Sequence, residues 1–219
     1  MSGPLLLVGG AEWREGCVFD AEALEAAGNP EVLVLPTAAA YEHPERAVEW
    51  AQRWFASLGG RARGLEVLRR SDAEREDLAA EVRAARFVYL GGGSPLHLRS
   101  VLKDSAVWEA LVAAWEEGAT VAGSSAGAMV LTDPMVDPRG GAFTLGLGLC
   151  SQLAVIPHFD DWSEDKARRT LELAPAGLPL VGIDERTALT KDARGWRVSG
   201  AGRVEVYVDG KESDLSRLP

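Results

Sequence analysis

The sequence has few of the residues that build metal sites and disulfide frameworks. It contains two cysteines, Cys17 and Cys150, and three histidines among 219 residues. The cysteines are too few and too unpatterned to predict a disulfide framework or a zinc site. The histidines lack the spacing of a metalloprotease ligand motif. We therefore expect no metal and no other cofactor.

Basic residues and long apolar runs are scarce as well. Lys and Arg number 23 against 33 Asp and Glu, which gives a formal net charge of -10. This balance argues against a nucleic-acid surface and against binding to an anionic membrane. No apolar run reaches the roughly 18 residues of a membrane span, and MSGPLLLVGG lacks the basic segment of a signal peptide. We expect a cytoplasmic protein without nucleic-acid or membrane partners.

The hydrophobic residues, 47% of the chain, are enough to build the core of one substantial α/β domain. Apolar runs that predict strands are Leu5–Val8, Val32–Leu35, Leu65–Leu68, Phe87–Leu90 and Thr120–Ala122. Segments with helical spacing of apolar residues are Asp20–Ala27, Pro44–Leu58, Asp72–Ala85 and Pro95–Glu117. Short apolar strands separated by helices indicate a mostly parallel sheet with helices on both faces.

The second half of the chain is less regular. Residues 133–148 are rich in Gly, Pro and Asp and predict a long loop or hairpin over the active edge of the sheet. Two more strands and a helix are predicted at Ala154–Ile156, Leu180–Ile183 and Ser163–Leu173. From Thr187 onward, alternating residues and turn signals predict an antiparallel meander. Without a linker or an internal repeat, residues 1–219 are expected to form a single domain.

The motif G-x-S-x-G occurs at Gly123–Gly127, between a predicted buried strand and an apolar helix. A serine in this context is typical of a nucleophile elbow, a sharp turn in which glycines avoid collisions with neighbouring backbone. Ser125 is therefore the candidate nucleophile. The N–H of Ala126, at the start of the helix, could stabilise an oxyanion. The alternative is a small-residue turn without chemistry.

A serine nucleophile needs a base, and His158 is the best candidate. It follows a predicted buried strand at the same sheet edge as Ser125. His43 lies in a polar turn, whereas packing or capping accounts for His97.

Several carboxylates could orient this base. Asp184 and Glu185 follow the next buried strand, Asp160 lies two residues after His158, and Asp133 or Asp137 lies in the loop after the elbow helix. We favour Glu185, with Asp184 as its substitute.

A triple glycine, Gly91–Gly93, follows the strand Phe87–Leu90 at the same edge. Backbone without side chains allows close approach to a ligand. The N–H of Gly92 could then supply the second half of an oxyanion hole with Ala126. A phosphate cradle is the rival interpretation, but no G-K-[ST] follows.

The blocks YLGGGSP, GSSAGA, PHF and GIDERTAL, in this order, resemble peptidase family S51, which includes aspartyl dipeptidase (peptidase E) and cyanophycinase. The resemblance implies a three-layer sandwich with a mostly parallel central sheet. This fold is flavodoxin-like and similar to class I glutamine amidotransferases, here with the C-terminal antiparallel meander. It also implies a triad of Ser125, His158 and Glu185 and an oxyanion hole of Gly92 and Ala126.

The resemblance further implies a serine peptidase that cleaves peptide bonds next to aspartate. One branch acts on Asp-X dipeptides and the other on an aspartyl-arginine polymer, so the substrate is a small peptide or that polymer. An acidic substrate would require a local cation. Arginines in segments that could reach the active edge are Arg99, Arg139, Arg168, Arg169 and Arg186.

Other classes are consistent with parts of the pattern. A glutamine amidotransferase would need cysteine at the elbow. An esterase of the α/β-hydrolase type would place its acid before its histidine, as Asp133 or Asp137 would do. A catalytically weak relative could keep the elbow and bind a small ligand. A homodimer could form through an exposed helix face.

Overall fold

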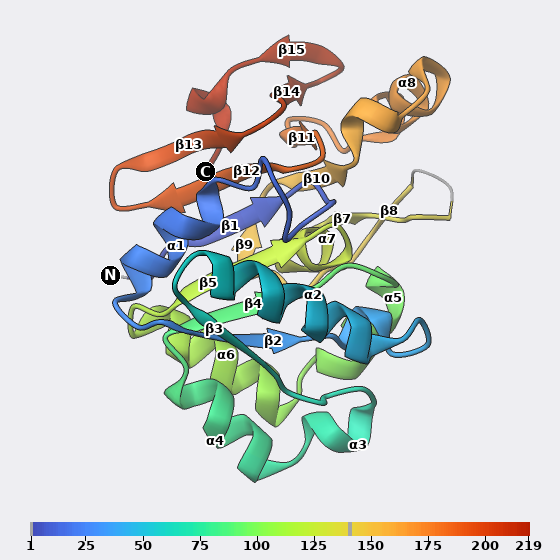
Figure 1. Cartoon of the computed structure of the whole chain (residues 1–219). Helices are drawn as coiled ribbons and strands as arrows, with labels where there is room; N and C mark the ends of the chain where they lie inside the picture. The colour runs from blue at the N-terminus through green and yellow to red at the C-terminus, as the bar shows by residue number, and fades with distance from the viewer. Residues whose placement is uncertain (1, 140–141) are drawn as a thin grey trace.

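The computed structural model describes residues 2–139 and 142–219, and its main sheet has seven strands in the order β13-β12-β1-β5-β4-β2-β3. The parallel strands are β1 (Leu5–Val8), β5 (Thr120–Ser124), β4 (Phe87–Leu90), β2 (Glu31–Leu35) and β3 (Arg61–Gly64). At one edge, β12 (Thr187–Asp192) and β13 (Gly195–Gly200) run antiparallel (Figure 1).

Both faces of the main sheet are buried beneath helices. Alternate residues of β1 show this, because Leu5 and Leu7 belong to one hydrophobic core and Leu6 and Val8 to the other. The second core is closed by α1 (Phe19–Ala27) and α2 (Pro44–Ser57). The first is closed by α4 (Glu76–Ala84), α5 (Pro95–Leu102), α6 (Ala106–Glu116) and α7 (Ala126–Leu131). The predicted fold class, an α/β sandwich with a mostly parallel sheet, is confirmed.

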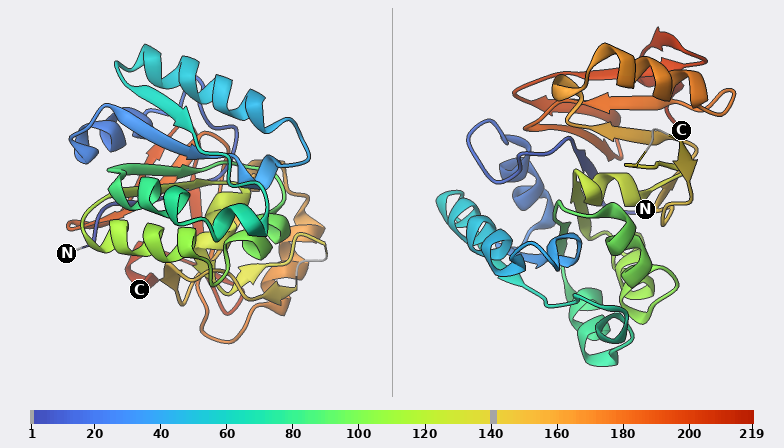
Figure 2. Two further views of the ribbon diagram at one scale, coloured as in Figure 1. Left: turned by 90° about the horizontal axis from the view of Figure 1, so that it is seen from below. Right: turned by 90° about the vertical axis from the view of Figure 1, so that its right-hand side faces the viewer.

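A second sheet of four strands, absent from the sequence-based prediction, completes the molecule. Its strands are β10 (Ala154–Pro157), β11 (Leu180–Ile183), β14 (Val204–Val208) and β15 (Lys211–Ser213). The predicted C-terminal meander is thus divided, because β12 and β13 extend the main sheet whereas β14 and β15 extend the second one. This C-terminal part, with α8 (Glu164–Leu173), groups on one side of the molecule (Figure 2).

Three predicted elements differ from the structure. The strand predicted at Leu65–Leu68 instead forms at Arg61–Gly64, an edge strand whose exposed arginines give no apolar signal. The helix predicted at 72–85 is split into α3 (Arg70–Ala73) and α4. The helix predicted at 95–117 is split into α5 and α6. There Asp104 has a φ of 54°, and Ser105 caps α6 by accepting from Trp108 N–H at 3.1 Å.

The segment between α7 and β10 contains only short strands. β7 (Met135–Val136) and β8 (Phe143–Thr144) form an antiparallel hairpin, as predicted for 133–148, although residues 140 and 141 lie outside the described part. β6 (Thr132–Asp133) pairs with β9 (Cys150–Ser151). Single turns of 3-10 helix lie at Thr37–Ala39, Phe159–Asp161 and Leu215–Arg217.

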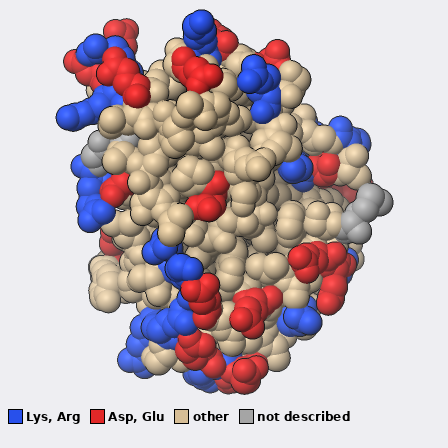
Figure 3. Space-filling model, turned by 180° about the vertical axis from the view of Figure 1, so that it is seen from behind, with Lys and Arg blue, Asp and Glu red and all other residues tan. Residues whose placement is uncertain are grey.

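Charges of both signs are interspersed on the surface. On the face opposite to that of Figure 1, acidic and basic side chains alternate around a largely uncharged centre (Figure 3). This distribution gives that face no continuous basic surface. Within the described residues, no helix is long and apolar enough to cross a membrane.

One carboxylate lies inside the core between the main sheet and the α1–α2 layer. Asp20 is completely buried, and its Oδ2 accepts a hydrogen bond from Trp54 Nε1 at 2.8 Å. Its other oxygen has no partner among the described residues. Burial raises the pKa of Asp20 to about 8, although the Trp54 hydrogen bond opposes the shift. The side chain is therefore mostly protonated at neutral pH.

We expect Asp20 to make the protein less stable as the pH rises. The pKa of Asp20 is higher in the folded than in the unfolded chain. Its contribution to the free energy of unfolding is therefore complete below about pH 4 and is lost as the pH rises toward 8. Asp20→Asn, which can still accept from Trp54, should flatten this decline and raise the free energy of unfolding at pH 8 by ~1–3 kcal/mol. Urea denaturation between pH 5 and pH 8.5 measures the effect.

The matched control is Glu25→Gln, a change of the same charge at an exposed position of the same helix. It should leave the pH dependence of the unfolding free energy unchanged. A wild-type pH dependence in Asp20→Asn would show that Asp20 does not titrate as its burial indicates.

Candidate active site

Ser125 lies on the sharp turn between β5 and α7. Its backbone has φ 50° and ψ -107°, a conformation that L-residues rarely adopt. A Cβ added at Gly123 would lie 2.5 Å from the carbonyl carbon of Gly127, and one added at Gly127 would lie 2.3 Å from Leu90 O. Both glycines of the motif are thus required by close backbone packing, as expected for a nucleophile elbow.

His158 reaches Ser125 from the second sheet. It follows β10 directly, and its backbone N–H donates to Gly9 O at 2.7 Å, which joins this turn to the end of β1. Its ring lies against Gly10, where an added Cβ would be 2.2 Å from the ring carbon Cε1. Nε2 lies 2.9 Å from Ser125 Oγ.

Glu185 lies on the other side of the same imidazole. It follows β11 after Asp184, and its Oε1 is 2.8 Å from His158 Nδ1. Its backbone N–H donates to Asp160 Oδ1 at 2.9 Å, so Asp160 holds the turn that carries Glu185. Because an ionised carboxylate can only accept, Nδ1 carries the proton, and the neutral ring accepts from the Ser125 hydroxyl through Nε2.

The other candidate acids are bonded to groups other than the His158 ring. Asp184 is buried and accepts from Arg203 N–H at 2.8 Å, while Asp133 accepts from Gly146 N–H at 2.9 Å. Asp137 binds Arg139 in an ion pair that lowers its pKa to about 2. Since none of the three is hydrogen-bonded to His158, the structure brings Glu185, and not its substitute, to the base. Since neither Asp133 nor Asp137 is hydrogen-bonded to His158, the triad of an α/β-hydrolase esterase, in which the acid precedes the histidine in the sequence, is not formed.

The remaining histidines and cysteines have other surroundings. His43 pairs with Glu45 on the surface, and His97 Nε2 is 2.9 Å from Leu68 O. Burial raises the pKa of the Cys17 thiol to about 11, and Cys150 is also buried with a raised pKa. Thiols held in the protonated form are poor nucleophiles, which disfavours amidotransferase chemistry.

The two predicted oxyanion donors flank the serine but differ in their partners. Ala126 begins α7, where backbone N–H groups have no acceptor within the helix. Gly92 lies beside the nucleophile, since a Cβ added to it would be 3.6 Å from Ser125 Cβ. Its N–H, however, already donates to Glu12 Oε1 at 3.1 Å. The sequence analysis missed Glu12, and only its place directly after Gly9–Gly10 and Ala11 could have indicated it.

Two cavities adjoin His158. One, of about 190 Å³, is lined by Ser125, Ala126, Trp162 and Lys166, among others. The other, of about 450 Å³, is lined by Glu12, Arg14, Arg46 and Gly92, among others.

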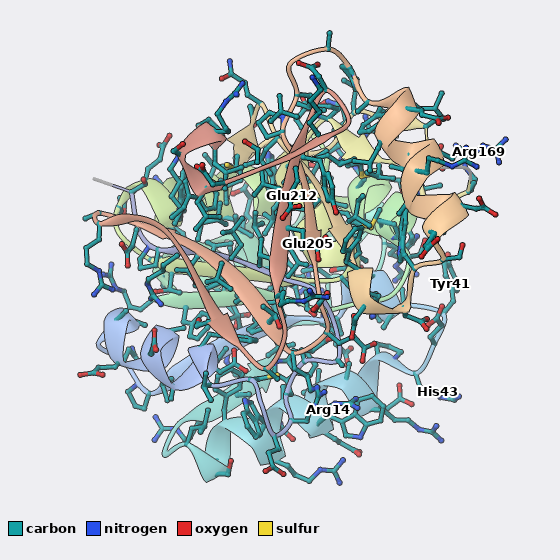
Figure 4. All side chains as sticks on the ribbon, turned by 90° about the horizontal axis from the view of Figure 1, so that it is seen from above. Arg14, Tyr41, His43, Arg169, Glu205 and Glu212 are labelled. Atoms are coloured by element: carbon teal, nitrogen blue, oxygen red, sulfur yellow. The ribbon has the colours of Figure 1, made fainter. Side chains whose placement is uncertain are left out.

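None of the five arginines considered from the sequence is among the described residues that line these two cavities. Arg169, for example, lies at the rim of the molecule on α8, whereas Arg14 lies closer to the centre of the view (Figure 4). Among the described residues, the cations that line the two cavities are Lys166, Arg14 and Arg46. In residues 2–139 and 142–219, no group of three or more His, Cys, Asp or Glu is placed to hold a metal ion.

An elbow serine hydrogen-bonded to a histidine, which is in turn bonded to a carboxylate, is the arrangement that defines serine hydrolases. More particularly, the chain belongs to peptidase family S51, a family of serine peptidases whose model matches residues 5–198.

Curated relatives are cyanophycinases. The chain is 30% identical over 166 residues to the cyanophycinase of Trichormus variabilis, a match that covers 70% of this chain and 56% of that protein. It is 26% identical over 221 residues to the cyanophycinase of Synechococcus elongatus, covering 93% and 67%. The chain thus spans little more than half the length of the first of these relatives.

Solved structures share the fold. A peptidase from an acI-B1 actinobacterium superimposes with a TM-score of 0.86 at 31% identity, over 97% of this chain and 93% of that one. A putative peptidase E protein from Listeria monocytogenes superimposes with a TM-score of 0.70 at 17% identity, over 92% and 100%. The second likeness concerns the fold alone.

The two neighbouring acids make a sharp test of this geometry. Glu185→Gln removes the charge that faces His158 Nδ1 and should lower kcat by about 10³- to 10⁴-fold, because the tautomer and the imidazolium lose their support. Asp184→Asn can still accept from Arg203 N–H and should retain kcat within about threefold. Steady-state kinetics on any cleaved substrate provides the measurement, and equal losses in the two variants would contradict the assignment of Glu185.

Proposed function

We propose that this protein is a serine peptidase that hydrolyses a peptide bond next to an aspartyl residue. The observation that carries the proposal is the continuous hydrogen-bonded chain from Ser125 Oγ to His158 Nε2, at 2.9 Å, and from Nδ1 to Glu185, at 2.8 Å. Family membership and the fold support a peptidase.

The reaction proceeds in two steps through an acyl-enzyme. Ser125 Oγ attacks the scissile carbonyl carbon while His158 Nε2 takes the hydroxyl proton and Glu185 stabilises the resulting imidazolium. The tetrahedral oxyanion is stabilised by the N–H groups of Ala126 and Gly92. His158 then gives its proton to the leaving amine as the C–N bond breaks. A water, deprotonated by the same nitrogen, attacks the ester and releases the acid.

Cations beside the nucleophile support an acidic substrate. Lys166 lines the smaller cavity together with Ser125, and its ammonium lies 3.9 Å from the centre of the Trp162 ring. Arg14 and Arg46 line the larger cavity. We assign the aspartyl side chain to the smaller cavity, because Lys166 is the one cation among the described residues that line it, and the one carboxylate there, Asp137, is already paired with Arg139.

A cyanophycinase-like activity is the second candidate, and the similarity to curated cyanophycinases favours it. The two candidates share the chemistry and differ in the length of the substrate. A dipeptidase acts on Asp-X, whereas the cyanophycinase branch acts on an aspartyl-arginine polymer. The relatives' names support the polymer, and the two cavities that adjoin His158 are compatible with either substrate.

A substrate panel tests the proposal. Purified protein and its Ser125→Ala form are incubated with Asp-Leu, Asp-Ala, Glu-Leu, β-Asp-Arg and the aspartyl-arginine polymer, and released products are quantified. We expect cleavage confined to aspartyl substrates and lowered by about 10⁴-fold or more in Ser125→Ala, because the triad acts as a unit. Cleavage of the polymer alone would select the second candidate.

A fluorophosphonate probe separates the nucleophile from the specificity. An activated Ser125 should be labelled in the wild type and not in Ser125→Ala, as read by intact mass. Labelling without cleavage of any aspartyl substrate would refute the substrate and keep the serine hydrolase. An absence of labelling would refute the enzyme.

A further inference from the structure

Glu12 forms hydrogen bonds to two segments that flank the nucleophile. Its Oε1 accepts from Gly92 N–H at 3.1 Å, and its Oε2 accepts from the Ser124 hydroxyl at 2.8 Å. Gly92 follows β4, and Ser124 immediately precedes the nucleophile. One half-buried carboxylate from the segment after β1 thus contacts both the predicted oxyanion donor and the elbow.

The Glu12 carboxylate forms no ion pair with the described residues, although Arg14 and Arg46 line the same cavity. Both donors are neutral groups, and among the described residues no Lys, Arg or His nitrogen lies within 4.0 Å of its carboxylate. The side chain lines the cavity of about 450 Å³ that also borders His158. A negative charge at this position disfavours a second negative charge on a nearby oxyanion.

The surroundings of Gly92 indicate where the Glu12 carboxylate lies relative to a bound substrate. A Cβ added to Gly92 would lie 3.3 Å from Glu12 Oε1 and 3.6 Å from Ser125 Cβ, so the carboxylate and the nucleophile flank the same glycine. An acyl group on Ser125 must place its carbonyl oxygen within about 3 Å of the donors of the oxyanion hole. A free α-nitrogen is separated from that carbonyl carbon by a single atom, or about 2.5 Å. An α-ammonium would therefore lie within reach of Glu12.

We propose that Glu12 is a specificity-determining residue that accepts the free α-ammonium of the acyl residue. Pairing with the ammonium neutralises the carboxylate and draws it from Gly92, whose N–H then serves the oxyanion. An acylated amine cannot supply the charge and leaves Glu12 on Gly92. The site therefore selects substrates whose scissile bond follows an amino-terminal residue. This inference rests on the proposed role of Ser125 as nucleophile.

The test compares two phosphonates that differ only at the amine: diphenyl 1-aminoethylphosphonate and its N-acetyl derivative. Ser125 Oγ attacks phosphorus, a P–O bond to serine forms, the bond to one phenoxide breaks, and the serine proton leaves with the phenol by way of His158. Intact mass follows the rate of adduct formation, which requires no aspartyl side chain.

We expect the wild type to react about 10- to 100-fold faster with the free amine, the value of a hydrogen bond to a charged group. Glu12→Gln keeps the shape, can accept from Gly92 and donate to Ser124, and loses the charge. In this variant the preference should fall to within about threefold. Glu15→Gln, an exposed residue of the same segment outside both cavities, should keep the wild-type preference.

Three results would overturn the proposal. Equal rates with the two phosphonates in the wild type would show that the amine is not recognised. If Glu12→Gln still prefers the free amine, another group recognises the ammonium, and Glu12 only holds Gly92 and Ser124 in place. If the fluorophosphonate probe fails to label the wild type, the proposed function falls and this inference with it. Labelling by that probe without an amine preference refutes the role of Glu12 alone.

Discussion

The site depends on a backbone contact between the end of β1 and the turns that follow β10 and β11. Gly9 O accepts from His158 N–H at 2.7 Å, and Gly10 O accepts from Arg186 N–H at 2.8 Å. A Cβ at Gly9 would lie 2.1 Å from Asp184 O, so no larger residue allows this approach. Ser125 follows a strand of the main sheet, whereas His158 and Glu185 follow strands of the second one. The glycine pair therefore brings Ser125 within hydrogen-bond distance of His158.

Each of the three turns that form the site contains a residue with positive φ. The values are 50° at Ser125, 51° at His158 and 56° at Arg186, which follows Glu185. A backbone with positive φ costs a non-glycine residue on the order of 1–3 kcal/mol. Packing and the hydrogen bonds to Gly9 and Gly10 offset this cost. These turns direct the side chains of Ser125 and His158 toward each other, so that Oγ and Nε2 lie 2.9 Å apart.

Surroundings give the carboxylates of this chain different properties. Asp20, in an apolar core, has its pKa raised to about 8, whereas an arginine neighbour lowers the pKa of Asp137 to about 2. Glu185 is bonded to an imidazole, and Glu12 only to neutral donors. Asp20 is mostly protonated in the core, Asp137 pairs with an arginine of its own loop, Glu185 contacts His158, and Glu12 contacts the two segments that flank Ser125. Residue type alone does not distinguish them.

The sequence by itself determined the elements whose signal is local. The buried strands β1, β2, β4 and β11 appear as apolar runs, and the elbow is visible because its glycines are adjacent to its serine. The location of Ser125, His158 and Glu185 at the ends of strands could also be predicted, since parallel strands place their carboxyl ends at one edge of the sheet. The charged edge strand at Arg61–Gly64 was missed because edge strands carry little apolar signal.

Only the tertiary structure decided which acid meets the histidine, how the last strands divide between two sheets, and where Glu12 lies. Asp184 and Glu185 are neighbours in sequence, but successive side chains at the end of a strand point to opposite sides, so one faces Arg203 and the other His158. The partners of Glu12 are 80 and 112 residues away. Contacts between segments so distant arise from packing of whole layers, which leaves no pattern in the local sequence.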